Sequence, residues 1–161
     1  MTPCRRTVGN SVFCNGTHTP LDFLSMMNSE YSGGCGCGAV RYRAAGQPSS
    51  CCFCHCESCR RASGAPFLAW ITFRTDEFRV LEGKVSTYRS SSHAERGFCS
   101  ACGTTLTYAH DARPGEIDLT TASFDSPEVF TPDRHIWVSD KLAWVSIDDG
   151  LRQFQGWSSE G

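Results

Sequence analysis

The chain has 161 residues, of which 40% are apolar and 20% are charged, and its formal net charge is −2. This length suits one domain with a real hydrophobic core, and the composition is that of an ordinary globular protein. Because the net charge is near zero and no stretch has the roughly 18 consecutive apolar residues of a membrane helix, neither nucleic acid nor a membrane is expected as a partner.

Cysteine is unusually frequent in this chain, with eleven residues, and eight of them stand in Cys-x-Cys or Cys-x-x-Cys spacing. Such close spacing favours shared metal ions over a disulfide framework. The sequence therefore predicts a reducing compartment, the cytoplasm. No apolar segment follows the arginine pair near the start, so a secretory signal peptide is not indicated.

Residues 1–31 combine Thr, Ser, Asn, Gly and Pro with isolated apolar residues, and they show neither helical nor strand periodicity. They are predicted to form a loose N-terminal arm, followed by one domain at residues 32–158. Cys4 and Cys14 lie in the arm without close partners. For these two, thiols outside any metal site are favoured over metal binding.

The first organised segment is a glycine-rich bend at residues 33–38, which contains Cys35 and Cys37. Glycines let the backbone curl until its N–H groups face the sulfur atoms. Beyond the bend, apolar Val40, Tyr42 and Ala44 alternate with arginines, which predicts a half-buried strand.

The central feature of the chain is Cys54-His55-Cys56-Glu57-Ser58-Cys59-Arg60-Arg61. Three thiols at these spacings can converge on one soft metal ion. A closed structural zinc takes four protein ligands, whereas a working zinc keeps one position free, and three thiols fit the second case. In an extended segment Cys52 shares a face with Cys54 and Cys56, so it rivals them as a ligand. A disulfide from one of these cysteines is the plainer alternative.

Residues Glu57 to Ser63 are predicted to form a short helix that ends at Gly64 and Pro66. The N–H groups at its start, together with Arg60 and Arg61, would favour thiolate over thiol. Phe67–Phe73 is apolar on both faces and predicts a central strand. Further short strands are predicted at residues 78–81, 85–89, 95–99, 104–109 and 117–123.

These elements predict a mainly β domain, in which short antiparallel strands form small sheets around the metal sites, with one short helix after the Cys-x-Cys-x-x-Cys run. Within it, Cys99 and Cys102 form a second close pair that is followed by a turn glycine. Either this pair or Cys35 with Cys37 could be a redox dithiol, but the four thiols together complete a closed Cys₄ zinc site.

The C-terminal stretch from His135 to Trp144 is rich in large side chains with polar tips and could cap a pocket. A hydrogen-bonded structural role is favoured for His135. Trp137 and Trp144 are more typical of a core than of a ligand contact.

Four motifs together resemble the glutathione-dependent formaldehyde-activating enzyme family, including the centromere protein V-like zinc domain. They are Gly-x-Cys-x-Cys-Gly-x-Val-x-Tyr, Cys-His-Cys-x-x-Cys-Arg, Phe-Cys-x-x-Cys-Gly, and His-Ile-Trp-Val followed by Asp-Asp-Gly-Leu, and they run in order from Gly33 to Trp157. The resemblance implies a mainly β fold with two zinc ions per chain. It places a structural zinc on Cys35, Cys37, Cys99 and Cys102, and a second zinc on Cys54, Cys56 and Cys59.

The resemblance also implies an activity, the addition of glutathione to formaldehyde, which is classed as carbon–sulfur lyase chemistry in the reverse sense. In that reading Cys54, Cys56 and Cys59 hold the working metal, which binds a substrate thiol. Residues expected to assist are His55 or His135 as proton donor and Arg60, Arg61 or Lys141 as contacts for the glutathione carboxylates.

A different class of function is a non-catalytic, zinc-stabilised module that binds a thiol or another protein. A vertebrate member of the family is associated with chromosomes and microtubules, but its basic extension is absent from this chain. Arg5 and Arg6 are the only basic residues in residues 1–31, too few for strong polyanion binding. The enzyme reading is therefore preferred.

Overall fold

The computed structural model describes residues 12–13 and 29–157. In these residues the strands form three sheets of eight, three and two strands, and the one α-helix is α2 (Glu57–Ser63). The predictions of a mainly β fold and of a short helix directly after the cysteine run are both confirmed. No helix in the described part is long and apolar enough to cross a membrane.

The eight-stranded sheet holds most of the residues that surround the candidate site. All its pairings are antiparallel except those of β12 with β4 and with β13, which are parallel. The predicted central strand lies in the interior of this sheet as β5. In sheet order the strands are β13 (Arg152–Gln153), β12 (Arg134–Ile136), β4 (Ser50–Cys54), β5 (Leu68–Arg74), β10 (Glu116–Thr120), β9 (Thr105–His110), β8 (Ala94–Phe98) and β7 (Ser86–Ser91).

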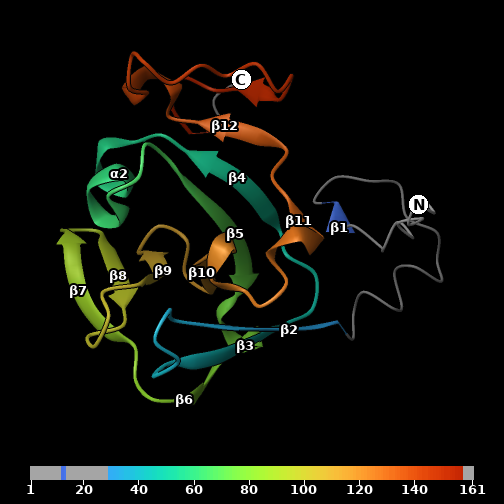
Figure 1. Ribbon diagram of the computed structural model, residues 1–161, viewed down its shortest axis with the longest axis vertical. Helices are drawn as coiled ribbons and strands as arrows, with labels where there is room; N and C mark the ends of the chain where they lie inside the picture. Colours follow the sequence, from blue (N-terminus) through green and yellow to red (C-terminus); the bar gives the residue numbers. More distant parts are fainter. Residues whose placement is uncertain (1–11, 14–28, 158–161) are drawn as a thin grey trace, which may run out of the picture.

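The three-stranded sheet lies at one end of the molecule, and β12 lies at the opposite end (Figure 1). It consists of β2 (Glu30–Gly34), β3 (Arg41–Ala45) and β6 (Phe78–Glu82), with β3 in the middle. Tyr42 and Ala44 of β3 are fully buried while the flanking arginines are partly exposed, as the alternation predicts. Four short 3₁₀ helices complete the described elements: Thr75–Glu77, Thr121–Ser123, Pro127–Val129 and Val138–Asp140.

Side chains on the two faces of the eight-stranded sheet belong to different clusters. Ile71 of β5 and Cys51 of β4 lie in the main core, whereas Trp70 and Cys52 lie in a second cluster with Cys54. Neighbouring residues therefore point to opposite faces, as expected for extended strands. One face of the sheet packs in the main core, and the other face carries the second cluster, which includes Cys54.

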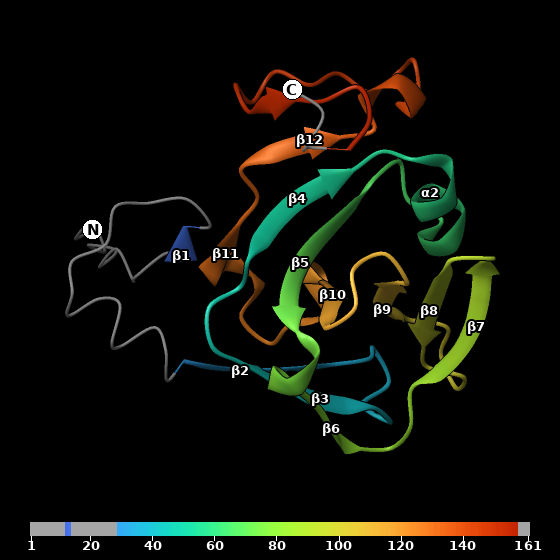
Figure 2. The ribbon, with the colours of Figure 1, turned by 180° about the vertical axis from the view of Figure 1, so that it is seen from behind.

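Helix α2 follows β4 directly and lies beside β7 and β8 (Figure 2). It ends at Gly64, which has the left-handed backbone angle φ of 69° and donates its N–H to the carbonyl of Arg60. Glycine adopts this conformation at little cost and commonly terminates helices. The Thr105 hydroxyl of β9 donates to the carbonyl of Ala62, which fixes the end of the helix to the sheet.

Strand β2 begins two residues before the predicted domain start at residue 32, and Tyr31 in β2 packs on Phe130 with ring centroids 4.8 Å apart. Further upstream, β1 (Val12–Phe13) pairs in parallel with β11 (Phe130–Thr131). The other residues up to 28, including Cys4 and Cys14, lie outside the described part. The loose arm as a whole stays a prediction.

A chain that starts at Met27 should melt within about 4 °C of the full chain, which corresponds to roughly 1 kcal/mol for a domain of this size. The reason is that β2 remains complete, and of the described contacts only the two-residue pairing of β1 is lost. A chain that starts at Ser32 is the matched comparison. It should be clearly less stable, because it lacks Tyr31. If circular dichroism shows that both shortened chains lose the same amount of melting temperature, the upstream residues pack on the core.

Candidate metal centres and the adjoining cavity

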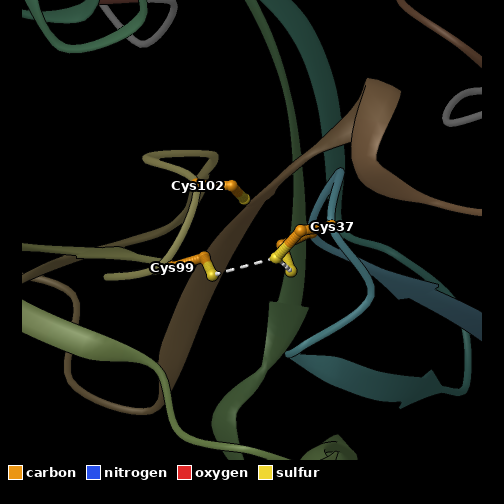
Figure 3. A group of neighbouring side chains, drawn as sticks. Cys37, Cys99 and Cys102 are labelled. Carbon is orange, nitrogen blue, oxygen red and sulfur yellow. Dashed lines mark hydrogen bonds between the residues drawn. The ribbon is translucent and has the colours of Figure 1, made fainter.

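The first candidate metal centre joins two hairpin-like turns. Cys35 and Cys37 lie between β2 and β3, and Cys99 and Cys102 lie between β8 and β9. Figure 3 shows Cys37, Cys99 and Cys102 turned toward one another. The Sγ atom of Cys37 is 3.5 Å from that of Cys35 and 3.8 Å from that of Cys99.

The positions of the four sulfur atoms fit tetrahedral coordination of one zinc ion. All four sulfur atoms lie within 4.8 Å of one another, and four sulfurs at tetrahedral zinc distances are about 3.8 Å apart. The N–H of Val40 donates to the Cys35 sulfur at 3.2 Å, and the Thr104 hydroxyl contacts the Cys102 sulfur at 3.1 Å. The contacts with Thr104 lower the pKa of Cys102 to about 5, which favours the thiolate form that binds metal.

The second candidate centre consists of Cys54, Cys56 and Cys59, whose sulfur atoms also lie within 4.8 Å of one another. Cys54 ends β4, and Cys56 is the N-cap of α2, where its sulfur accepts the N–H of Cys59 at 3.3 Å. The helix start therefore faces the thiols, as predicted. Cys54 and Cys59 are buried, and Cys56 is partly exposed.

Cys59 is the thiol of this cluster whose surroundings most favour the thiolate form. Its sulfur accepts the indole N–H of Trp70 and an N–H of Arg96, both at 3.4 Å. Hydrogen bonds from Cys54 and Cys56, and then the charge of Arg96, lower the pKa of Cys59. The same sulfur contacts, with burial, raise the pKa of Cys54. In the absence of metal, the geometry thus favours a thiolate at Cys59 that accepts hydrogen bonds from its neighbours.

Cys52 lies next to the cluster but does not belong to the group of three sulfurs. Burial raises the pKa of its thiol to about 12, so it is a weak candidate for a ligand. Cys51 points to the other face, into the main core. None of the nine described cysteines forms a disulfide, which removes the plainer alternative for the described residues.

A cavity of about 910 Å³ opens next to the three-cysteine centre and includes Cys54, Cys56 and Cys59 in its wall. Three arginines also line it, Arg96 on β8, Arg113 before β10 and Arg134 on β12. Arg113 pairs with Asp118 at 2.5 Å and with Glu116 at 3.0 Å. Arg134 pairs with Asp133 at 2.9 Å and donates to the Ser50 hydroxyl at 2.6 Å.

Aromatic side chains complete the wall. Trp70 and Tyr108 lie near the thiols, while Trp137 and Trp157 come from the C-terminal segment. The expectation that Trp137 and Trp144 are core residues is wrong, because they are 37% and 72% exposed. Trp137 stands at a left-handed backbone position, φ 56°, where the chain leaves β12, and it lines the cavity instead of the core. The C-terminal segment does contribute to the wall of the cavity, through Trp137, Asp140 and Trp157.

The cationic residues singled out in the sequence lie outside the wall of this cavity. Arg60 donates through Nε to the carbonyl of His55, and Arg61 pairs with Glu57 on the exposed side of α2. Lys141 donates to the carbonyls of Leu142 and Val145. Their role as glutathione contacts stays a prediction.

The buried His55 and His135 form a hydrogen-bonded chain that ends at the exposed Asp149. Nε2 of His55 lies 2.8 Å from Nδ1 of His135, and Nε2 of His135 lies 2.8 Å from a carboxylate oxygen of Asp149. Burial lowers the pKa of His55 to about 4. His135 stacks on Phe53, which faces away from Cys52 and Cys54, and neither histidine lines the cavity. Their role as proton donors also stays a prediction.

Sequence reasoning did not single out Arg96, Trp70 or Tyr108 as site residues. They come from three strands and meet only because the sheet order brings β5, β9 and β8 together on one face. The available signal was weak: strand alternation at the predicted segments 67–73, 95–99 and 104–109 gives each residue a face, but not the neighbouring strand.

A family model described as "Glutathione-dependent formaldehyde-activating enzyme" matches residues 30–140. This span contains both cysteine clusters. The chain belongs to this family. A second match is an uncharacterized lyase of Schizosaccharomyces pombe, 36% identical over 113 residues, which are 70% of this chain and 81% of the relative.

Two further relatives agree with the assignment to the glutathione-dependent formaldehyde-activating enzyme family. A Halomonas elongata protein, provisionally named as such an enzyme, is 30% identical over 139 residues, which are 80% of this chain and 88% of the relative. A crystal structure of a Rhodobacter sphaeroides protein superposes with a TM-score of 0.50 and 24% identity, over 76% of this chain and 98% of that one. The latter supports the fold alone.

Replacing Cys99 with Ser should remove one bound metal ion and give largely insoluble or unfolded protein, because a closed four-thiolate site contributes directly to folding. Cys99 is fully buried in the main core, so the matched control is Cys52→Ala, a buried cysteine outside both clusters. That control should keep the metal content of wild type. Metal analysis and thermal melting check both. A soluble Cys99→Ser chain that melts like wild type would contradict the assignment.

Proposed function

We propose that this protein is a zinc-dependent enzyme of the carbon–sulfur lyase type, which joins glutathione or a similar thiol to formaldehyde or a related aldehyde. In this reaction a carbon–sulfur bond forms, the carbonyl double bond opens, and the thiol proton ends on the former carbonyl oxygen. The observation that carries the proposal is a cluster of only three thiols that lies in the wall of a cavity.

The two cysteine clusters differ in a way that assigns them different roles. The four-cysteine cluster has a complete tetrahedral donor set, which fits a structural zinc. Among the described residues the three-cysteine cluster has no fourth sulfur, and the nearby Cys52 does not supply one. A zinc ion held by these three thiolates supplies a Lewis acid with a free position, which lowers the pKa of a thiol.

The charge of the donor set favours capture of a thiol over activation of water. Three thiolates and one divalent ion carry a net charge of about −1, which weakens the ion as a Lewis acid. Water, whose pKa must be lowered by many units, is the harder target, whereas a thiol needs a far smaller shift. The donor set thus supports thiol chemistry.

The cavity can bind a substrate much larger than formaldehyde. Its volume of about 910 Å³ lies within the range of sites for drug-sized ligands. Arg134 lines it, and the Nε of Arg134 is buried without a partner among the described residues. Arg134 therefore joins Arg60, Arg61 and Lys141 as a candidate contact for a thiol substrate that carries carboxylates, since arginine binds carboxylates through charge-assisted hydrogen bonds.

His55 and His135 are the proposed proton donors, and the geometry also supports the structural role weighed for His135. Both of its ring nitrogens are engaged, one by His55 and one by Asp149. The backbone N–H of His55 donates to the backbone carbonyl of Ile136. These hydrogen bonds thus connect the loop of the three cysteines to β12.

Cys56→Ser tests the proposal directly. Wild type should bind two zinc ions, and the variant should bind one, keep its fold and lose thiol–aldehyde activity above the uncatalysed rate. The fold should survive because an open site contributes less to folding than the closed site does. Zinc stoichiometry, melting and formation of the hemithioacetal are measured beside wild type and Cys52→Ala.

Cobalt substitution gives a test that does not depend on turnover. Glutathione should change the absorption spectrum of wild-type protein with cobalt in the three-cysteine centre, and it should leave Cys56→Ser unchanged. If glutathione fails to change the wild-type spectrum, or if Cys56→Ser keeps both metal ions, the catalytic proposal is overturned and a zinc-stabilised interaction module takes its place.

A further inference from the structure

Arg96 is a buried cation without a carboxylate partner. It lies in the middle of β8 with 3% of its surface exposed. Among the described residues, no aspartate or glutamate forms an ion pair with it, unlike the nearby cavity arginines Arg113 and Arg134. A buried charge is costly unless an opposite charge lies close by. The structure must therefore supply another anion for Arg96.

The contacts of Arg96 all point to the three-cysteine centre. Its Nη2 donates to the Cys59 sulfur at 3.4 Å and to the Ser58 hydroxyl at 3.0 Å. Its guanidinium carbon lies 4.8 Å from the ring centroid of Tyr108 and 5.9 Å from that of Trp70. These two rings hold the guanidinium group in place beside Cys59 and partly compensate its charge.

Two donors of Arg96 remain without partners. Nε and Nη1 are buried and make no hydrogen bond with any described residue. Carboxylates normally satisfy such a guanidinium group through paired hydrogen bonds, so a packing role alone does not explain why this position carries arginine. A cluster with net negative charge next to the guanidinium group does explain it, because it provides the missing anion.

We infer that Arg96 is the counter-ion of the metal centre at Cys54, Cys56 and Cys59 and the residue that positions Cys59. The inference rests on the proposed function only in that these thiolates hold a divalent ion. Three thiolates and one divalent ion leave a charge of about −1, which Arg96 neutralises at the one sulfur it contacts.

The contact has a consequence for the chemistry of the centre. Hydrogen bonds from Arg96 and from the indole N–H of Trp70 draw negative charge away from the Cys59 sulfur. Groups that contact a ligand in this way tune the affinity and acidity of the metal. Cys59 becomes the weakest electron donor of the three, and Arg96 offsets part of the loss of Lewis acidity that three thiolates cause.

The experiment compares Arg96→Met, Arg96→Lys and wild type in the full chain. Methionine keeps an unbranched apolar stem without the charge, and lysine keeps the charge. Arg89→Met is the matched control, because Arg89 lies on the adjacent β7 and forms an exposed ion pair with Asp111. Chelator competition measures zinc affinity, the cobalt spectrum reports the sulfur–metal bonds, and Cys56→Ser identifies which affinity belongs to which centre.

In Arg96→Met, zinc affinity at the three-cysteine centre should fall by about 10- to 100-fold, as is typical when a partner of a metal ligand is removed. The four-cysteine centre should keep its affinity, the sulfur-to-cobalt band should shift, and Arg89→Met should match wild type. Arg96→Lys should lie closer to wild type than to Arg96→Met. If Arg96→Met does not fold, the Arg96→Lys variant tests the role of Arg96 by itself. It should retain the second zinc.

A role limited to packing would lower the melting temperature of Arg96→Met and leave its zinc affinity and cobalt spectrum unchanged, and this result would overturn the inference. Equal affinities in Arg96→Lys and Arg96→Met, or loss of the second zinc from folded Arg96→Lys, would overturn it as well. A wild-type chain that binds one metal ion would overturn the proposed function too. Two ions in wild type with unchanged affinity in Arg96→Met would overturn only the role of Arg96.

Discussion

The structure depends on the convergence of four sulfur atoms from turns that are far apart in the sequence. Cys37 and Cys99 lie 62 positions apart, yet their sulfurs are 3.8 Å apart. One turn connects two strands of the three-stranded sheet, and the other connects β8 and β9 of the eight-stranded sheet. The two sheets therefore meet at this cluster beside the main core, in which Cys35 and Cys99 are themselves buried, and a metal ion on the four sulfurs would fix the sheets to each other. A domain of this size gains much from such a link, since its core alone gives only modest stability.

The four-cysteine cluster lies on the core side, so the other face of the eight-stranded sheet can form the cavity wall. Because β8 and β9 are held to the core through Cys99 and its turn, their other face carries Arg96 and Tyr108 toward the three thiols. Helix α2 then closes against this face through Ser58 and Ala62. The four-cysteine cluster and the three-cysteine cluster are thus connected through the strands and have no cysteine in common.

Much of this arrangement could be predicted from the sequence, because many of its features depend on residues that are close together in the chain. Spacing and alternation are local, so they gave both cysteine clusters, the helix at Glu57–Ser63 and the central strand β5. Short strands with few apolar residues gave no such signal. Strand β12 has three residues and is defined by parallel pairing with β4, more than 80 positions away.

The wall of the cavity was the least predictable part for the same reason. Strand alternation assigns Arg96 a face but does not say which strand is adjacent, and Arg60 and Arg61 were favoured because they adjoin the cysteines in sequence. In the structure, these two arginines bind a carbonyl oxygen and Glu57, respectively. Closeness in sequence was a good guide to the cysteines whose sulfur atoms cluster within 4.8 Å, but it carried no information about the strands that form the cavity wall.

Under the proposed role of Arg96, charge balance explains why an arginine distant in sequence would matter more to this centre than the adjacent Arg60 and Arg61. A cation exposed at the end of α2 is screened by water, whereas Arg96 acts from a site that water hardly reaches. With Arg96 included, the three thiolates and a divalent ion would sum to about zero, so an incoming thiolate would make the net charge only about −1. Without Arg96 the same step would raise it to about −2 inside a buried site, which is far less favourable. On this argument the buried arginine, rather than the number of cysteines alone, makes the centre able to accept a thiolate.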